Sequence, residues 1–229
     1  MSAEAPSLSS RDEVLRRIRA AIGNTSDDTP AANAAAINAE WNTLPRDYKR
    51  TPSLGPEAKL ELLEDRLRDY DAQVVHTKTG EVAAMIARLL TQRGKRRLVV
   101  PIGLPEALGE PLPGGFEFIV DKGFAAAELD TFEGVVTAST VAIAETGTIV
   151  LQTVPGQGRR AATLVPDYHL CIVRVTDVVE TVPEAMARLQ STATLATTFV
   201  SGPSATADIE MTRIKGVHGP RFLDVVLVP

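Results

Sequence analysis

The sequence has one cysteine, few aromatic residues and no long apolar run, and each shortage excludes a class of protein. Cys171 alone can form neither an internal disulfide nor a four-cysteine zinc or iron–sulfur site. Aromatic residues make up 4% of the chain, which argues against base-stacking surfaces for nucleic acid. No segment is apolar enough to span a bilayer, and the N-terminus lacks a signal-peptide core. We therefore expect a cytoplasmic protein with no membrane span.

Basic residues are also outnumbered by acidic ones. The chain has 24 lysines and arginines and 29 aspartates and glutamates, which gives a formal net charge of −5. A basic surface for nucleic acid is therefore not expected. The three histidines, His76, His169 and His218, stand apart with no metal-ligand spacing. No metal site is predicted. Cys171 lies in the apolar run "HLCIVRV", which indicates a buried thiol.

The first 50 residues differ in pattern from the rest of the 229. The stretch "SSRDEVLRRIRAAIG" predicts an amphipathic helix, with Ser10 and Glu13 spaced as a capping box. A segment rich in Asn, Asp, Pro and Ala follows and reads as an arm. We assign residues 1–50 to an N-terminal helix and extended arm. The arm can pack on a partner chain or on its own domain, and the sequence leaves both open.

Residues 51–229 alternate short apolar strands with helices of ordinary length. This pattern predicts an α/β domain with a mostly parallel sheet. The runs "STVAIAE" and "TIVLQT" are separated by a very short turn, which predicts a hairpin. Near the C-terminus, "FVSGPSATADIE" has the form of a strand, a loop and the start of a helix.

The turn of the predicted hairpin carries the first candidate site residues. Glu145 follows the apolar run directly and could act as a general base, a nucleophile or a hydrogen-bond acceptor. Thr146 and Gly147 complete the turn, and Gly147 leaves room for a ligand. A solvent-exposed hairpin tip without a function is the alternative, and residue type and spacing alone favour it.

Two arginines and a group of polar residues are the other candidates. Arg159 and Arg160 follow a glycine-rich loop, and a guanidinium there could bind a carboxylate or a phosphate. A solvated surface loop is the alternative. Further along the chain, the candidate ligand contacts are Ser201, Ser204, Thr206 and His218. The alternatives are an ordinary capped helix for the first three residues and a structural turn for His218.

Taken together, four motifs resemble the lactate utilization protein C family, whose shared module is the LUD domain. They are "AIAETGTIVL", "GQGRRAATLVPDYHLCIVRV", "SGPSATADIE" and "GVHGPR", in the order of the family. The resemblance implies a Rossmann-like sheet of the NagB/RpiA/CoA-transferase type. It also implies a role in oxidising L-lactate to pyruvate as one member of a three-protein system. In that family iron–sulfur clusters belong to partner proteins, so no cofactor is expected on this chain alone.

The resemblance leaves three functions open. The first is a subunit or accessory protein of a lactate-oxidising complex with iron–sulfur partners. The second is a stand-alone enzyme, of CoA-transferase or sugar-phosphate type, with Glu145 as the catalytic residue by analogy with the glutamate of CoA transferases. The third is a sensor of a small organic acid. In each case we expect Glu145, Arg159 and Arg160 at the carboxyl end of the sheet, where α/β folds bind ligands.

Overall fold

A computed structural model describes residues 10–21, 30–49, 51–206, 214–216 and 218–229 of the chain. The chain forms two compact units, residues 1–48 and residues 49–229. None of the helices in the described ranges combines the length and the hydropathy that crossing a bilayer requires.

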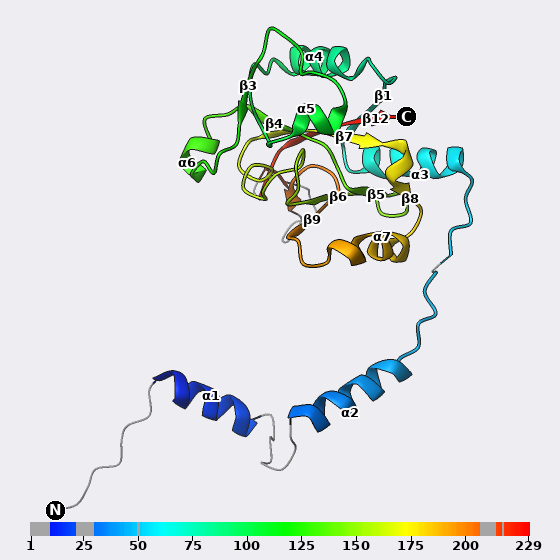
Figure 1. The fold of residues 1–229 in the computed structure, drawn as a ribbon, viewed down its shortest axis with the longest axis vertical. Coiled ribbons are helices and arrows are strands. Elements are labelled where there is room, and N and C mark those ends of the chain that lie inside the picture. Colours follow the sequence, from blue (N-terminus) through cyan, green and yellow to red (C-terminus); the bar gives the residue numbers. More distant parts are fainter. Residues whose placement is uncertain (1–9, 22–29, 50, 207–213, 217) are drawn as a thin grey trace, which may run out of the picture. The chain divides into compact units, whose positions relative to one another are not determined.

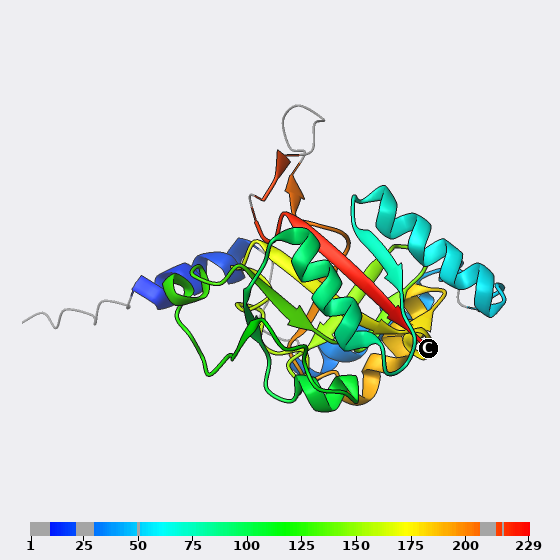
Figure 2. The ribbon, with the colours of Figure 1, turned by 90° about the horizontal axis from the view of Figure 1, so that it is seen from above.

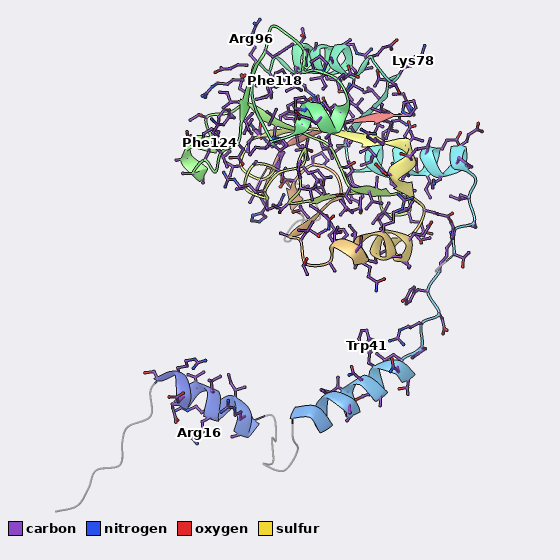
Figure 3. The ribbon with its side chains drawn as sticks, viewed as in Figure 1. Arg16, Trp41, Lys78, Arg96, Phe118 and Phe124 are labelled. Carbon is purple, nitrogen blue, oxygen red and sulfur yellow. The ribbon has the colours of Figure 1, made fainter. Side chains whose placement is uncertain are left out.

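The first unit contains two helices with exposed side chains. They are α1 (Ser10–Ala21) and α2 (Pro30–Thr43). No residue of α1 is buried, and its polar face is held by the ion pair of Arg16 with Glu13, at 2.7 Å. Trp41 of α2 is 61% exposed, and Figure 3 shows it and Arg16 extending from their helices. Helix propensity thus acts in both helices, with ion pairs added on α1, and none of the side chains described in this unit is buried.

The second unit is built on a six-stranded, fully parallel sheet. Its strand order is β1-β12-β7-β4-β2-β3. The strands are β1 (Gln73–His76), β2 (Arg97–Val100), β3 (Glu117–Val120), β4 (Gly134–Thr137), β7 (Tyr168–Arg174) and β12 (Phe222–Val228). The prediction of an α/β fold with a mostly parallel sheet is therefore confirmed.

A second sheet of four strands packs against the first. Its strand order is β8-β5-β6-β9. The strands are β5 (Val141–Ile143), β6 (Thr148–Gln152), β8 (Val178–Val179) and β9 (Thr197–Val200). The antiparallel pairing of β5 with β6 confirms the predicted hairpin, with Ile143 opposite Thr148. The sequence patterns predicted this pair of strands, but they did not predict that the pair belongs to a sheet separate from the parallel one.

Helices cover the outer faces of the two sheets (Figure 1). The longer ones are α3 (Pro56–Asp69), α4 (Val82–Arg93) and α7 (Val182–Leu189). The short ones are α5 (Leu104–Leu108), α6 (Ala126–Leu129), η1 (Val175–Asp177) and η2 (Gln190–Thr192). Helices α4 and α5 pack on one face of the parallel sheet, and α3 packs with the four-stranded sheet on the other. Helix α7 covers the far face of the four-stranded sheet.

Strand β7 lies in the middle of this stack and is buried on both faces. Its side chains alternate: Leu170 and Ile172 face α4, whereas Cys171 and Val173 face the four-stranded sheet. Burial of both faces explains the nearly continuous apolar run in the sequence. It also means that each polar side chain within β7 needs a partner inside the protein.

The segment after β9 differs from its prediction. In place of a helix start, Ala205–Thr206 form strand β10, which pairs antiparallel with β11 (Ile214–Lys215). Figure 2 shows this ribbon projecting from the sheet layers. Main-chain hydrogen bonds between the two strands replace the expected helical ones. The rest of the predicted helix, residues 207–210, lies outside the described residues.

A buried carboxylate fixes β12 to its neighbours. Asp224 is fully buried and accepts a hydrogen bond from Arg93 Nε at 3.1 Å, with Arg93 Nη2 on its other oxygen. The Tyr168 hydroxyl donates to the same carboxylate at 2.9 Å. One aspartate thus joins β12, β7 and α4. Removing it would leave a buried hydroxyl and a half-buried guanidinium without their acceptor.

We therefore expect Asp224→Ala to lower the free energy of unfolding by about 3 kcal/mol, because breaking a buried ion pair leaves an uncompensated charge. Tyr168→Phe, which removes one neutral donor, should cost about 1 kcal/mol. Urea denaturation of the two variants beside the wild type checks this order. Equal stabilities of Asp224→Ala and Tyr168→Phe would contradict it.

Candidate functional site

A pocket of about 220 Å³ lies where β7 and β12 begin. His169, the second residue of β7, and Leu223, the second residue of β12, line it. The loop before β7 contributes Arg160, and the loops before β12 contribute Ser204 and His218. The pocket is therefore at the amino edge of the parallel sheet, and Arg160 lies there and not at the carboxyl edge where it was expected. In a parallel sheet, every loop that leads into a strand reaches that amino edge.

Arg160 is the cationic group of this pocket. Its side chain is exposed, and its Nη1 lies 3.4 Å from the Thr163 hydroxyl. Within the described ranges no carboxylate forms an ion pair with it. Partial burial lowers the pKa of the guanidinium, which nevertheless stays charged at neutral pH. Arg160 can thus accept an anionic ligand.

His169 is a buried imidazole at the same pocket. It is 2% exposed, and its Nε2 lies 2.8 Å from the Thr137 hydroxyl. That hydroxyl donates to the Cys171 sulfur at 3.6 Å, and the thiol donates to the Ala138 carbonyl at 3.8 Å. Because the Thr137 hydroxyl has a single hydrogen, this chain assigns the ring hydrogen to His169 Nε2.

The same chain leaves Nδ1 of His169 as an acceptor. Among the described residues, no group forms a hydrogen bond with Nδ1. Every described side-chain nitrogen or oxygen that is buried from solvent has a hydrogen-bond partner. His169 lines the pocket, where an unpaired Nδ1 would meet a ligand. Burial, followed by the charge of Arg160, lowers the pKa of His169 to about 4. At neutral pH the ring is a neutral hydrogen-bond acceptor.

Hydrogen bonds hold the remaining pocket residues in place. The Ser204 hydroxyl accepts from the His218 main-chain N–H at 3.1 Å, and the Ser204 N–H donates to the Pro220 carbonyl at 2.8 Å. The Ser201 and Thr148 hydroxyl oxygens lie 2.7 Å apart. Thus the pocket brings together four predicted residues: Arg160, Ser201, Ser204 and His218. Thr206 lies on β10, and its side chain is outside the description.

Arg159 has a different environment from Arg160. Its Nε and Nη2 donate to the two oxygens of Asp121, at 2.7 and 3.0 Å, and Nη2 also donates to the Phe124 carbonyl. Asp121 precedes it by 38 residues, so sequence spacing gave no sign of the pair. With its donors engaged in this way, Arg159 anchors the loop after β3. We assign it no ligand.

Glu145 lies in the β5–β6 turn, and neither it nor Thr146 nor Gly147 lines the pocket. Its Oε1 accepts from Lys49 Nζ at 3.1 Å, and its side chain is 33% exposed. Gly147 has φ +57°, and a Cβ there would lie 2.8 Å from Cβ of Arg66 on α3. Close packing on α3 therefore accounts for this glycine. The Thr146 hydroxyl oxygen lies 2.7 Å from that of Thr148, which in turn contacts the pocket residue Ser201.

The neighbouring Glu180 is the more strongly held carboxylate. Its fully buried side chain accepts from the main-chain N–H groups of Ser53 and Leu54, at 2.6 and 2.7 Å, and from Lys49 Nζ. The Lys49 ammonium, with help from these N–H groups, lowers the pKa of Glu180 to about 2. Glu180 thus fastens the segment that leads into α3 onto the four-stranded sheet.

The stabilising effect of Glu180 should depend on pH. Because its folded pKa lies below the ordinary value of 4.5, its contribution is complete above pH 4.5 and is lost as the pH falls toward 2. We expect Glu180→Gln to lower the urea midpoint clearly at pH 7 and much less at pH 3. Glu145→Gln, which alters only a partly exposed pair, should have a small effect at both values. An equal loss for Glu180→Gln at pH 7 and pH 3 would contradict this assignment.

Sequence reasoning did not select two polar side chains that line the pocket, His169 and Thr163. His169 stood alone in the sequence, and Thr163 carried no signal at all. These two residues line the pocket because β7 is buried and because two loops that are distant in the sequence lie beside its first residues. Among the described residues, no group of three His, Cys, Asp or Glu side chains could hold a metal ion.

Comparisons with known proteins agree on one family. Residues 60–228 match the model of the LUD domain. The "Lactate utilization protein C" of Deinococcus radiodurans is 40% identical over 183 residues, 77% of this chain and 84% of that protein. The protein of the same name from Bacillus pumilus is 30% identical over 234 residues, 93% and 94% of the two chains. A crystal structure of a DUF162 family protein from D. radiodurans aligns with TM-score 0.66 and 35% identity, over 77% of this chain and all of that one.

Proposed function

This chain belongs to the LUD domain family, and from that premise we propose that it is a subunit or accessory protein of an L-lactate utilization system. The names of its relatives support the link to lactate. The observation that carries the proposal is the pairing, in one small pocket, of an arginine that forms no ion pair with a described carboxylate and a neutral imidazole acceptor. We expect the chain to act in the cytoplasm.

The pocket has the chemistry to recognise a small 2-hydroxy acid. Arg160 would bind the carboxylate through charge-assisted hydrogen bonds. The 2-hydroxyl group would donate to Nδ1 of His169, which is an acceptor in the assigned tautomer. A volume of about 220 Å³ lies below the range for drug-sized ligands and suits an acid of few carbons. Ser201 and Ser204 add hydroxyl groups at the wall.

Oxidation of lactate to pyruvate would require redox groups on other proteins of the system. Cys171, the one cysteine in the sequence, is fully buried, and burial raises the pKa of its thiol to about 12. A single buried thiol cannot ligate an iron–sulfur cluster. We therefore propose that iron–sulfur partner proteins accept the electrons, whereas this chain binds the acid.

The two alternatives are less well supported. An enzyme of CoA-transferase type would need Glu145 at a substrate pocket, but Glu145 is paired with Lys49 and does not line the amino-edge pocket. A sensor would use this pocket in the same way without partners that oxidise the acid. Isolation of the complex, rather than binding alone, distinguishes a sensor from a subunit.

We expect L-lactate to bind the wild type and Arg160→Gln to weaken its binding by about tenfold to a hundredfold, the equivalent of losing a charge-assisted hydrogen bond. Isothermal titration calorimetry measures both affinities. Arg188→Gln is a matched control, because Arg188 lies on α7, outside the pocket.

Propionate, which lacks the 2-hydroxyl group, tests the role of His169. It should bind the wild type more weakly than lactate, and His169→Leu should remove that difference while the melting curve shows a folded protein. Equal affinity of the wild type for lactate and propionate would count against the assigned acceptor.

Purification of the tagged chain from its own cells grown on lactate tests the proposed assembly. We expect stoichiometric partners and the broad visible absorbance of iron–sulfur clusters in the eluate. A variant with Arg160→Gln should retain the partners, because the pocket and not the interface is altered. A colourless eluate with no partner would reject the subunit role and leave the sensor.

A further inference from the structure

A second pocket, of about 350 Å³, opens at the opposite edge of the parallel sheet. It lies where β4, β7 and β12 end, next to Ser139, Arg174 and Val228. This is the carboxyl edge, where open α/β sheets usually bind their ligands. It shares no lining residue with the amino-edge pocket of Arg160 and His169.

Gln157 presents an unpaired donor to this carboxyl-edge pocket. The residue is 7% exposed, and its Oε1 accepts from the Gln152 main-chain N–H at 2.7 Å and from the Thr140 hydroxyl at 2.8 Å. A main-chain N–H can only donate, so the orientation of the carboxamide is fixed. In the described part of the chain, no acceptor pairs with Nε2 of Gln157. Every described side-chain nitrogen or oxygen that is buried from solvent has a hydrogen-bond partner. Because Nε2 of Gln157 has none, it is exposed to the cavity that Gln157 lines.

Close packing holds the loop of Gln157 rigid. A Cβ on Gly156 would lie 2.5 Å from Cβ of Ala107, and one on Gly158 would lie 2.9 Å from Cβ of Pro101. Both glycines have positive φ, of +82° and +76°. The loop therefore lies directly against the segment that follows β2, which only glycine allows here. The amide donor of Gln157 is thus fixed before any ligand binds.

The pocket also offers one cation and an apolar wall. Arg174 ends β7, is exposed and donates from Nη2 to the Ala107 carbonyl at 2.6 Å, and no described carboxylate forms an ion pair with it. Leu108, Ile172 and Val228 supply apolar surface.

A single acidic side chain, Glu110, lines the same pocket. It accepts from the N–H groups of Val82 and Ala83 at the start of α4, at 3.1 and 2.9 Å. The helix N-terminus balances its charge in part. The remaining negative potential favours a monoanion over a dianion such as a phosphate monoester.

We propose that the carboxyl-edge pocket is a second ligand site, for an organic monocarboxylate with an apolar body larger than that of lactate. The carboxylate is held by Arg174 and by Nε2 of Gln157. The body of the ligand lies against Leu108, Ile172 and Val228. The proposal does not depend on the function of the amino-edge pocket, since the two sites share no residue.

Phenylacetate is a suitable probe, because it joins one carboxylate to an apolar ring. The full-length chain labelled with ¹⁵N reports the side-chain NH₂ signals of Gln157, which through-bond experiments assign. We expect a saturable shift of these signals with an affinity in the millimolar range, as suits so small a ligand. 2-Phenylethanol, the uncharged counterpart, and phenyl phosphate, the dianion, should shift them far less.

Two variants complete the test. Arg174→Gln should weaken phenylacetate binding about tenfold or more, whereas Arg160→Gln, in the other pocket, should leave it unchanged. The proposal is overturned by any of three results: unmoved Gln157 signals, an equal response to the alcohol, or unchanged affinity in Arg174→Gln. A stronger response to phenyl phosphate than to phenylacetate would overturn the monocarboxylate assignment.

Discussion

The burial of β7 on both faces is the constraint on which the other features depend. A strand between two apolar layers has no water for its polar groups, so each must find a partner within the protein. The Tyr168 hydroxyl meets this demand through Asp224, and Nε2 of His169 meets it through Thr137, whose hydroxyl also donates to Cys171. The same burial keeps His169 neutral and lowers its pKa to about 4. A requirement of folding thereby sets the hydrogen-bonding character of the amino-edge pocket.

The direction of the strands then determines which residues meet. Loops that lead into β7 and β12 deliver Arg160, Ser204 and His218 to the amino edge. Segments that follow β2 and β4 deliver Glu110 and Ser139 to the carboxyl edge, and β7 itself ends there at Arg174. The glycine-rich loop contributes to both edges, since Gln157 lines one pocket and Arg160, three residues later, lines the other. One parallel sheet thus carries two chemically distinct pockets.

The sequence allowed much of the fold to be predicted, because periodicity and turn residues are local signals. The β5–β6 hairpin and the alternation of helices with strands followed from such signals. The motifs also singled out Arg160, Ser201, Ser204 and His218, which do lie together. What failed were properties set by distant partners. The Asp121–Arg159 pair, the edge at which the pocket lies and the pairing of β10 with β11 all depend on contacts that no local pattern encodes.

Glycine and glutamate positions show the same limit. Gly147, Gly156 and Gly158 looked like the loops of a ligand site, but each is explained by a neighbour that leaves no room for a Cβ. Glu145 became a catalytic candidate by analogy with the glutamate of CoA transferases, and the structure pairs it with Lys49 beside the buried Glu180. Gln157, which lies in the second motif but was not a candidate residue, has the clearest unpaired donor at the carboxyl edge.

The most direct test of the central claim is a crystal structure of the full-length chain soaked with L-lactate. The account predicts the carboxylate on the guanidinium of Arg160 and the 2-hydroxyl group within hydrogen-bond distance of Nδ1 of His169. Lactate bound beside Glu145 or at the carboxyl edge, with the amino-edge pocket holding only water, would contradict it.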